Sequence, residues 1–155
     1  MTFALDLQKF AEKAGKRADI VVGQTVAQLA ATVDFRSPVG DAKYWKHPAP
    51  KGYVGGRFRA NWNLGIGAID LSVTSAVDTS GKSPDRGGNT TGTIIAQIPE
   101  EASGKVYYLS NSLPYAQRLE DGWSRQAPQG ILARTAAEFQ STVDEAVAEA
   151  KRQAP

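Results

Sequence analysis

The feature that most limits what this chain can fold into is a repeat of apolar side chains every three or four residues from Phe3 to Val33. Charged residues such as Lys9 and Lys13 fall between them. This period places the apolar residues on one face of an α-helix, so the sequence predicts a long N-terminal helix, which Gly15 or Gly23 could soften. The predicted stripe consists of Phe3, Leu7, Phe10, Ala14, Ala18, Val21, Val22, Leu29 and Val33.

A second segment with the same period predicts a helix near the C-terminus. Its apolar positions are Leu132, Ala136, Phe139, Val143, Val147 and Ala150. Between the helices, the runs 62–73 and 105–111 are bounded by turn formers and predict the strands of one small sheet. The segment around Ile94 fits a strand or a helix, and a short helix is favoured.

These elements predict an α+β fold, in which a small, mainly antiparallel sheet packs against the long N-terminal helix and the C-terminal helix. A chain of 155 residues with 41% hydrophobic content supports one domain, residues 1–155. The stretches 34–56 and 76–92 are rich in proline or glycine and predict long irregular loops. Loops of this length in a compact domain are usually functional or disordered, so contacts with other chains are expected there.

The residue inventory gives little support for catalysis. The chain has no cysteine, which excludes disulfides and thiolate metal sites. Its single histidine, His47, precedes a proline in a loop and lacks a rigid element to hold it in place. The sequence therefore predicts no enzyme, no cofactor and no metal site.

The net charge and the hydropathy of the chain limit the classes of partner that we expect it to bind. A net charge of +2 is far from the dense positive field of a non-specific nucleic-acid binder. No window reaches the roughly 20 apolar residues of a membrane span, and the N-terminus lacks the pattern of a signal peptide. We therefore expect no membrane contact and synthesis in the cytoplasm.

The segment "GGRFRANWN" at residues 55–63 combines two arginines with two large aromatic residues. Arg57 and Arg59 are weak nucleic-acid candidates, because aromatic rings can stack on bases while arginines neutralise phosphates. The favoured interpretation is a helical turn that buries Phe58 and Trp62 while both arginines face water.

The segment "NSLPYAQRLEDGWSRQAPQG" at residues 111–130 predicts a short helix followed by a rigid bend. Asn111 or Ser112 could cap the helix, and Pro114 tolerates its first turn. Its apolar face would consist of Tyr115, Ala116 and Leu119. Gly122 suits a left-handed helix end, and Pro128 prevents immediate continuation of the helix.

Two features of this bend leave alternatives open. Glu120 and Asp121 lie at a predicted helix C-terminus, where the helix dipole disfavours negative charge. They form either a solvated pair balanced by Arg118 or Arg125, or an ion pair between subunits. Trp123 either plugs the core over the sheet or anchors an interface.

Together, "SPVGD…GGRFRANWN" and "VYYLSNSLPYAQRLEDGWSRQAPQGILARTAAEF" resemble the tail-completion or neck proteins of long-tailed bacteriophages. The resemblance covers Ser37 to Phe139, and its second block is the more specific. The matching positions there are Asn111, Pro114, Tyr115, Ala116, Leu119, Glu120, Gly122, Gln126, Ala127, Pro128 and Gly130. The first block departs from the pattern, because residues 41–55 separate Pro38 and Val39 from Gly56, and Gly55 stands in place of a threonine.

The resemblance implies a structural virion protein of the phage neck or tail, assembled in the host cytoplasm. Such a protein forms a homo-oligomeric ring, hexameric in the symmetry of the tail, that joins the DNA-filled head to the tail. Its partners would be head-completion or connector proteins and tail terminator or tail tube proteins, with genomic DNA passing through the lumen. The alternatives are a tail terminator or other minor tail ring protein and, from another class, a small DNA-binding protein.

Ring subunits meet through two different surfaces, so each chain needs complementary patches. We expect one patch on the bend and a second contact on the loop of residues 41–55. The candidates for the subunit interface are Tyr115, Leu119, Glu120, Asp121, Trp123, Arg125, Gln126 and Pro128. The candidates for the loop contact are Tyr44, Trp45 and Tyr53.

Overall fold

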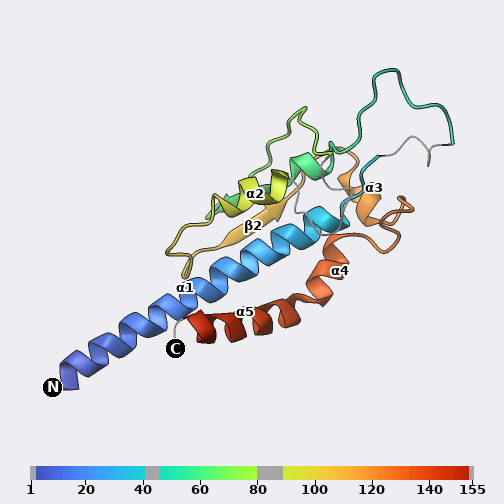
Figure 1. Ribbon diagram of the computed structural model, residues 1–155. Coiled ribbons are helices and arrows are strands. Elements are labelled where there is room, and N and C mark those ends of the chain that lie inside the picture. Colours follow the sequence, from blue (N-terminus) through green and yellow to red (C-terminus); the bar gives the residue numbers. More distant parts are fainter. Residues whose placement is uncertain (1–2, 41–45, 80–88, 154–155) are drawn as a thin grey trace.

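The computed structural model describes residues 3–40, 46–79 and 89–153, and it is built around one long helix (Figure 1). The helices are α1 (Phe3–Arg36), α2 (Asn89–Ile95), α3 (Ala116–Glu120), α4 (Leu132–Ala137) and α5 (Phe139–Gln153). A 3-10 turn, η2 (Arg59–Asn61), precedes the strands β1 (Asn63–Ile66) and β2 (Tyr107–Ser110). Helix α5 packs along one side of α1, and α2 with the sheet lies on the other. The predicted α+β class is confirmed.

Helix α1 is continuous through Gly15 and Gly23, so neither glycine breaks it. Only the C-terminal part of the predicted apolar stripe packs against the rest of the protein, where Val33 is buried and Val22 packs against the core. The N-terminal part extends beyond the end of α5, and Phe10 on this part is 70% exposed (Figure 1). The periodicity predicted the helix correctly, but it did not show that Leu7 and Phe10 of the stripe are exposed in the described structure.

The two strands form an antiparallel pair, with Leu64 opposite Leu109 and Ile66 opposite Tyr107. The prediction of an antiparallel sheet is confirmed, but the predicted strands were too long. β1 ends at Ile66 because Gly67 adopts a left-handed conformation with φ 76° and turns the chain. The ambiguous segment near Ile94 is helical, as favoured from the sequence.

The predicted C-terminal helix is interrupted at Glu138, which separates α4 from α5. The Glu138 backbone (φ −96°, ψ 3°) leaves the helical path. Its carboxylate accepts a hydrogen bond from Arg36 of α1 at 2.6 Å, and Arg36 also donates to Thr135 at 3.0 Å. These contacts fasten the junction between the two helices to the end of α1.

The hydrophobic core combines residues of α1, β1 and α2 with residues that flank η2 or belong to the bend. Its buried members are Val26, Ala30, Val33, Phe58, Trp62, Leu64, Ile94, Leu113, Ala127 and Ile131. The core therefore lies between the C-terminal half of α1, the sheet, α2 and the bend of residues 111–131. No described helix is long and apolar enough to cross a membrane.

Candidate interaction surfaces

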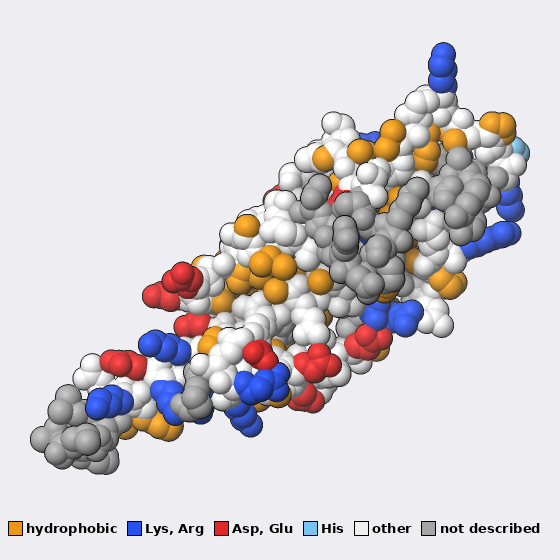
Figure 2. Space-filling view, in the orientation of Figure 1, with side chains coloured by type: hydrophobic (Ala, Val, Ile, Leu, Met, Phe, Trp, Pro, Cys, Tyr) orange, Lys and Arg blue, Asp and Glu red, His pale blue; other side chains and the backbone are white. Residues whose placement is uncertain are grey.

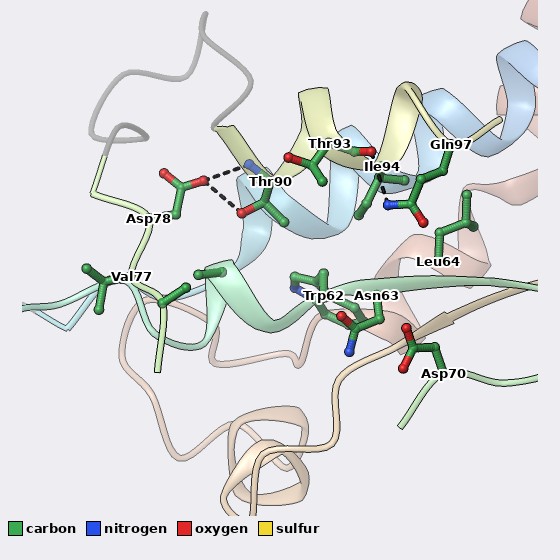
Figure 3. Close-up of a pocket in the computed structure, with 12 residues that line it drawn as sticks. Trp62, Asn63, Leu64, Asp70, Val77, Asp78, Thr90, Thr93, Ile94 and Gln97 are labelled. Carbon is green, nitrogen blue, oxygen red and sulfur yellow. Dashed lines mark hydrogen bonds between the residues drawn. The ribbon is translucent and has the colours of Figure 1, made fainter. Parts of the chain in front are cut away.

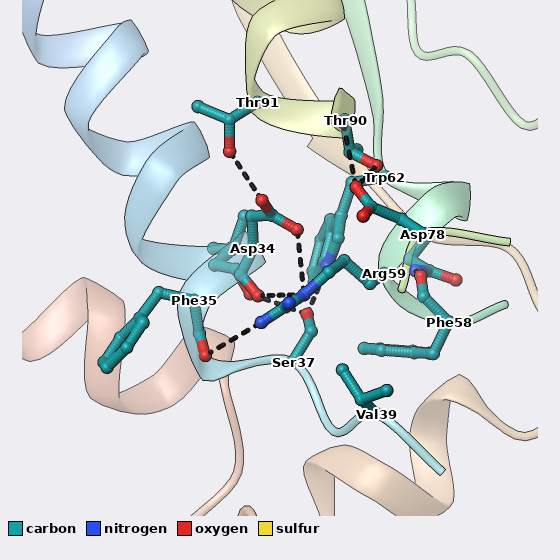
Figure 4. A network of polar contacts seen from close by, with 12 residues as sticks. Asp34, Phe35, Ser37, Val39, Phe58, Arg59, Trp62, Asp78, Thr90 and Thr91 are labelled. Carbon is teal, nitrogen blue, oxygen red and sulfur yellow. Dashed lines mark hydrogen bonds and ion pairs between the residues drawn. The ribbon is translucent and has the colours of Figure 1, made fainter. Parts of the chain in front are cut away.

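A buried ion pair joins the segment 55–63 to the end of α1 (Figure 4). The Nε of Arg59 lies 3.2 Å from the Asp34 carboxylate and donates to the Asp34 carbonyl at 3.0 Å. The side chains of Arg59 and Asp34 are only 4% and 2% exposed. The prediction that both arginines face water is therefore wrong for Arg59, because its guanidinium compensates a buried carboxylate and binds carbonyls at a helix C-terminus.

Three further hydrogen bonds extend this network. The Trp62 indole donates to the Ser37 hydroxyl at 2.7 Å, and that hydroxyl donates to the Val33 carbonyl at 2.6 Å. Thr91 on α2 donates to the Asp34 carboxylate at 2.6 Å (Figure 4). The burial of Phe58 and Trp62 is confirmed, and the network fixes η2 and α2 against α1.

After β1 the chain reverses direction and runs back along residues 61–65. It contacts every second residue of that stretch: Asn61, Asn63 and Gly65. A Cβ on Gly65 would lie 2.0 Å from the Ala68 carbonyl oxygen, so only glycine allows this approach. The Asn63 amide donates to the Ser72 carbonyl at 2.8 Å. The Asn61 side chain accepts from the Thr74 amide at 2.7 Å. Residues 68–74, which we call the return segment, thus run antiparallel to residues 61–65, held by side chains in place of a strand ladder.

The return segment turns its apolar side chains outward. Leu71 is 62% exposed, and Ile69, Val73 and Val77 are also exposed. Figure 2 shows hydrophobic side chains at this surface. The backbones of Leu71 and Val73 make no hydrogen bond to another described residue. An extended segment with unpaired backbone groups and an outward apolar row is the kind of edge to which another strand can add.

A pocket of about 250 Å³ lies beside the return segment, between β1 and α2 (Figure 3). Trp62, Leu64 and Ile94 form its apolar part. Two carboxylates, Asp70 and Asp78, also line the pocket, and Asp78 accepts hydrogen bonds from the Thr90 amide at 3.0 Å and the Thr90 hydroxyl at 2.8 Å, at the start of α2. Asp78 thus fixes the start of α2, and the apolar part of the lining offers space for an apolar side chain.

Glu120 caps α4 from within the same chain. Its carboxylate accepts hydrogen bonds at 2.9 Å from the backbone amides of Ile131, Leu132 and Ala133. Burial alone would raise the pKa of Glu120, but the Ala133, Leu132 and Ile131 amides outweigh it and lower the pKa below the ordinary value. The charge of Glu120 is therefore stabilised at the N-terminus of the next helix, by partners that neither predicted alternative included, while an ion pair between subunits stays a prediction.

The neighbouring polar residues of the bend also have partners within the chain. Asp121 accepts from the Gln117 side chain at 2.9 Å. Gln126 accepts from the Val39 amide at 3.1 Å and donates to the Val39 carbonyl at 2.9 Å. Gly122 is left-handed at φ 79°, as predicted for the helix end. The predicted side-chain cap of α3 is absent, since Tyr115 occupies the N-cap position without a side-chain hydrogen bond.

Trp123 is 73% exposed, so it does not plug the core. The Arg118 guanidinium lies 5.4 Å from the centroid of its ring, which is the geometry of a cation–π contact. Arg125 and Pro128 are also exposed, whereas Leu119 is half-buried. The role of these residues as interface contacts stays a prediction.

The other predicted contact residues do not form one patch. Tyr44 and Trp45 lie outside the described residues. Tyr53 is partly exposed, and its hydroxyl packs so closely on Gly40 that a Cβ there would lie 1.8 Å from it. Arg57 is exposed and donates to the Thr74 carbonyl at 3.4 Å, while Arg59 is buried, so the two arginines do not form a joint basic surface.

Within residues 3–40, 46–79 and 89–153, no three histidine, aspartate or glutamate side chains are grouped closely enough to hold a metal ion. The chain matches no protein-family model, and no curated protein or solved structure matches it significantly.

Sequence reasoning missed two features of these surfaces. One is the Asp34–Arg59 pair, whose partners are 25 positions apart. The other is the return segment, although Asn61, Asn63 and Gly65 at alternate positions and Ile69, Leu71 and Val73 at alternate positions are its signals. The sequence predicted the run 62–73 as one strand, but β1 ends at Ile66 and the apolar row of the second half of the run faces away from the protein.

Proposed function

We propose that this chain is a structural protein of a tailed bacteriophage, a tail-completion or neck protein that forms an oligomeric ring joining the DNA-filled head to the tail. The proposal begins from the two sequence blocks that resemble this family. In the fold these blocks are in contact: the Asn111 side chain donates to the Phe58 carbonyl at 2.8 Å, and the rings of Phe58 and Tyr115 lie 6.3 Å apart. The residues that carry the resemblance thus belong to one packed unit.

The observation that carries the proposal is the exposed Trp123 on a bend that the chain holds in place. Glu120 ties the start of the bend to α4, and Gly122 and Gly130 have positive φ values of 79° and 74°. An ordered bend that presents a large aromatic ring to solvent suits an anchor for a protein partner, because aromatic anchors dominate binding energy at interfaces. Both carboxylates of the bend, Glu120 and Asp121, accept hydrogen bonds within the chain, so the binding energy would come mainly from Trp123.

A head-to-tail ring also requires a second, different surface on each subunit. The return segment offers one, since Leu71 and its exposed neighbours form an apolar row with unpaired backbone groups. This row lies on another part of the chain from Trp123, which suits a protein that contacts neighbours on more than one side.

The alternative of a DNA-binding protein is less well supported. Of its two arginine candidates, Arg59 is engaged with Asp34 in the core and only Arg57 reaches the surface. The alternative of a tail terminator uses the same kind of ring and is separated from the proposal by experiment.

The test is electron microscopy of lysates from a phage that lacks this gene, complemented by the wild-type chain, Trp123→Ala or Trp123→Phe. We expect the gene deletion and Trp123→Ala to give filled heads beside unjoined tails of normal length, and Trp123→Phe to restore joined particles. Tails of uncontrolled length would assign the terminator role. Normal infectious particles from the deletion would refute the proposal.

A further inference from the structure

We propose that Trp123 of one copy of this chain inserts into the pocket between β1 and α2 of a second copy, with Arg118 of the first copy beside Asp70 of the second. The inference rests on the proposed function, since it names the contact by which one ring subunit meets the next. It joins two different surfaces of the chain, as a head-to-tail ring requires.

The bend presents an aromatic ring together with cations. Trp123 is 73% exposed, and its backbone amide donates to the Arg118 carbonyl at 3.1 Å. The Arg118 guanidinium lies 5.4 Å from the ring centroid, and Arg125 is exposed two residues later. Neither arginine forms an ion pair with a carboxylate in the part of the chain that the structure describes. The surface that best complements this bend therefore combines an apolar cavity of indole size with a carboxylate.

The pocket beside the return segment has the size for an indole ring. Its volume is about 250 Å³. A cavity of about 150 Å³ accepts benzene, so an indole, with nine heavy atoms in place of six, needs roughly 225 Å³. Trp62, Leu64 and Ile94, each at most 5% exposed, supply the apolar lining (Figure 3). Val77 also lines the pocket and is 46% exposed, so the apolar lining continues to the surface.

The pocket also offers acceptors for the indole N–H, which a buried tryptophan normally needs. The Gln97 side-chain nitrogen donates to the Thr93 carbonyl at 3.1 Å, and the Asn63 side-chain nitrogen donates to the Ser72 carbonyl at 2.8 Å. The side-chain oxygens of Gln97 and Asn63 accept no hydrogen bond from the residues that the structure describes. Either oxygen can therefore accept from the inserted ring.

Asp70 supplies the carboxylate. It accepts a hydrogen bond from the Ser72 backbone amide at 2.9 Å, and hydrogen bonds from Ser72 lower the pKa of Asp70 below its ordinary value, so it is charged at neutral pH. It forms no ion pair with any described residue. An arginine that arrives beside the inserted ring thus meets a carboxylate whose charge no cation of its own chain has neutralised.

The pocket that Trp123 fills is not the one in its own chain. Residues 60–97 supply the whole lining, and the bend contributes none of it. Helix α3, which leads into the bend, and α2, which borders the pocket, are separated along the direction of α1 (Figure 1). The hydrogen bonds of Glu120 to α4 hold the bend in this place. Because both halves of the contact are present on every chain, the occupant is a second copy.

The absence of cysteine makes the contact testable in the full chain. The variant Ser124→Cys/Ala76→Cys places one thiol next to Trp123 and one on an exposed residue of the pocket lining. With a short bis-maleimide we expect ladders of linked chains, because each chain carries both halves of the contact. Adding Trp123→Ala should reduce the ladders at least tenfold, whereas Trp123→Phe should largely keep them.

The matched control for position is Ser124→Cys/Ser141→Cys, whose second thiol lies on an exposed position of α5. We expect at least tenfold less ladder from this variant. Ladders from Ser124→Cys/Ala76→Cys that are absent, or that are equal with and without Trp123→Ala, would overturn the inference.

A charge exchange tests the pairing of Arg118 with Asp70. Ser124→Cys chains are mixed with Ala76→Cys chains that carry a size tag, and the linked product of the two is measured. Adding Arg118→Glu to the first chain should reduce this product about tenfold, and adding Asp70→Lys to the second should then restore it. A loss that the second exchange does not restore, or linking that ignores both exchanges, would overturn the inference.

Phage joining separates this inference from the proposed function. Ala76→Trp places a large side chain at an exposed position of the pocket lining, so it should prevent joining as Trp123→Ala does. Joining that survives Ala76→Trp but not Trp123→Ala would refute the pocket contact, assign Trp123 to a different protein of the particle and leave the ring proposal standing. Ladders from a gene that is dispensable for joining would support the contact and refute only the proposed function.

Discussion

Replacing Glu120 tests how the bend is held. The carboxylate accepts three backbone N–H groups at the start of α4, and one of them belongs to Ile131, a residue that is 1% exposed. Loss of a helix cap costs about 1 kcal/mol, and a buried donor left unpaired adds about 1 kcal/mol. We therefore expect Glu120→Ala to lower the free energy of unfolding by about 2 kcal/mol. Glu120→Gln keeps one acceptor oxygen and should cost about 1 kcal/mol.

The same contact predicts a pH dependence. The folded state lowers the pKa of Glu120, so the carboxylate stabilises the protein at pH values above its unfolded pKa. This stabilisation is lost as the pH falls through the lowered pKa of the folded state. We expect the difference between wild type and Glu120→Gln to be full at neutral pH and to shrink as the solution is acidified below the ordinary value of 4.5.

Urea unfolding followed by circular dichroism at a series of pH values measures both effects. For a domain of this size, 1 kcal/mol corresponds to roughly 2–4 °C in melting temperature, which gives an independent check. The matched control is Asp121→Asn, since Asp121 is the adjacent carboxylate and contacts only the Gln117 side chain in the bonds described above. Equal stability losses for Glu120→Gln and Asp121→Asn, or a difference from wild type that does not change with pH, would refute the reasoning.

Three other changes should separate structural from surface roles. Arg59→Met should lower the free energy of unfolding by about 3–5 kcal/mol in urea, because it leaves a buried carboxylate uncompensated. Arg57→Met should change the free energy of unfolding by less than about 0.5 kcal/mol. Similar losses for the two variants would contradict the burial of Arg59. Gly65→Ala should lower the free energy of unfolding by about 1–3 kcal/mol and speed amide exchange in the return segment. Gly15→Ala, with open space around it, should raise the free energy of unfolding by about 0.5–1 kcal/mol. A change in the same direction for both variants would count against the close approach of Ala68 to Gly65. Trp123→Ala should cost less than about 1 kcal/mol in thermal unfolding, although the proposed function predicts that it abolishes joining; a large loss would show that its ring is packed.

Local pattern was enough to predict the helices, and it failed where the answer depended on distant residues. The period of α1 predicted a continuous helix, and Ile94 lies in the short helix that was favoured for it. Nothing local showed that Phe10 is exposed, because the same stripe continues into the packed half of the helix at Val22 and Val33. Periodicity identifies a face of a helix but does not show what covers that face.

The polar contacts of the bend also could not be predicted from the local sequence. Judged from the neighbouring sequence alone, Glu120 lies at a helix C-terminus, where the helix dipole disfavours a negative charge. One predicted explanation balanced this charge with a nearby arginine, and the other paired it with a residue of another subunit. The real partners are amides 11 to 13 residues later, at the start of another helix. Arg59 was likewise predicted from its turn alone, while its partner Asp34 is on α1. Long-range contacts decide the role of a charged residue, and a single sequence does not contain them.

The positions that carry the family resemblance hold the bend together, and the exposed aromatic residue is not among them. Glu120 caps α4, Gln126 binds the backbone of Val39, and Gly122 and Gly130 allow left-handed turns that a side chain would strain. Trp123 lies between these positions and contacts only the cation of Arg118 among the interactions described above. If the pattern specifies a scaffold and the residues between its positions specify the partner, an exchange at Trp123 should change which ring or neighbour is recognised while the fold is kept. Under the proposed function, we therefore expect exposed residues outside the pattern, such as Trp123 and Leu71, to determine partner choice.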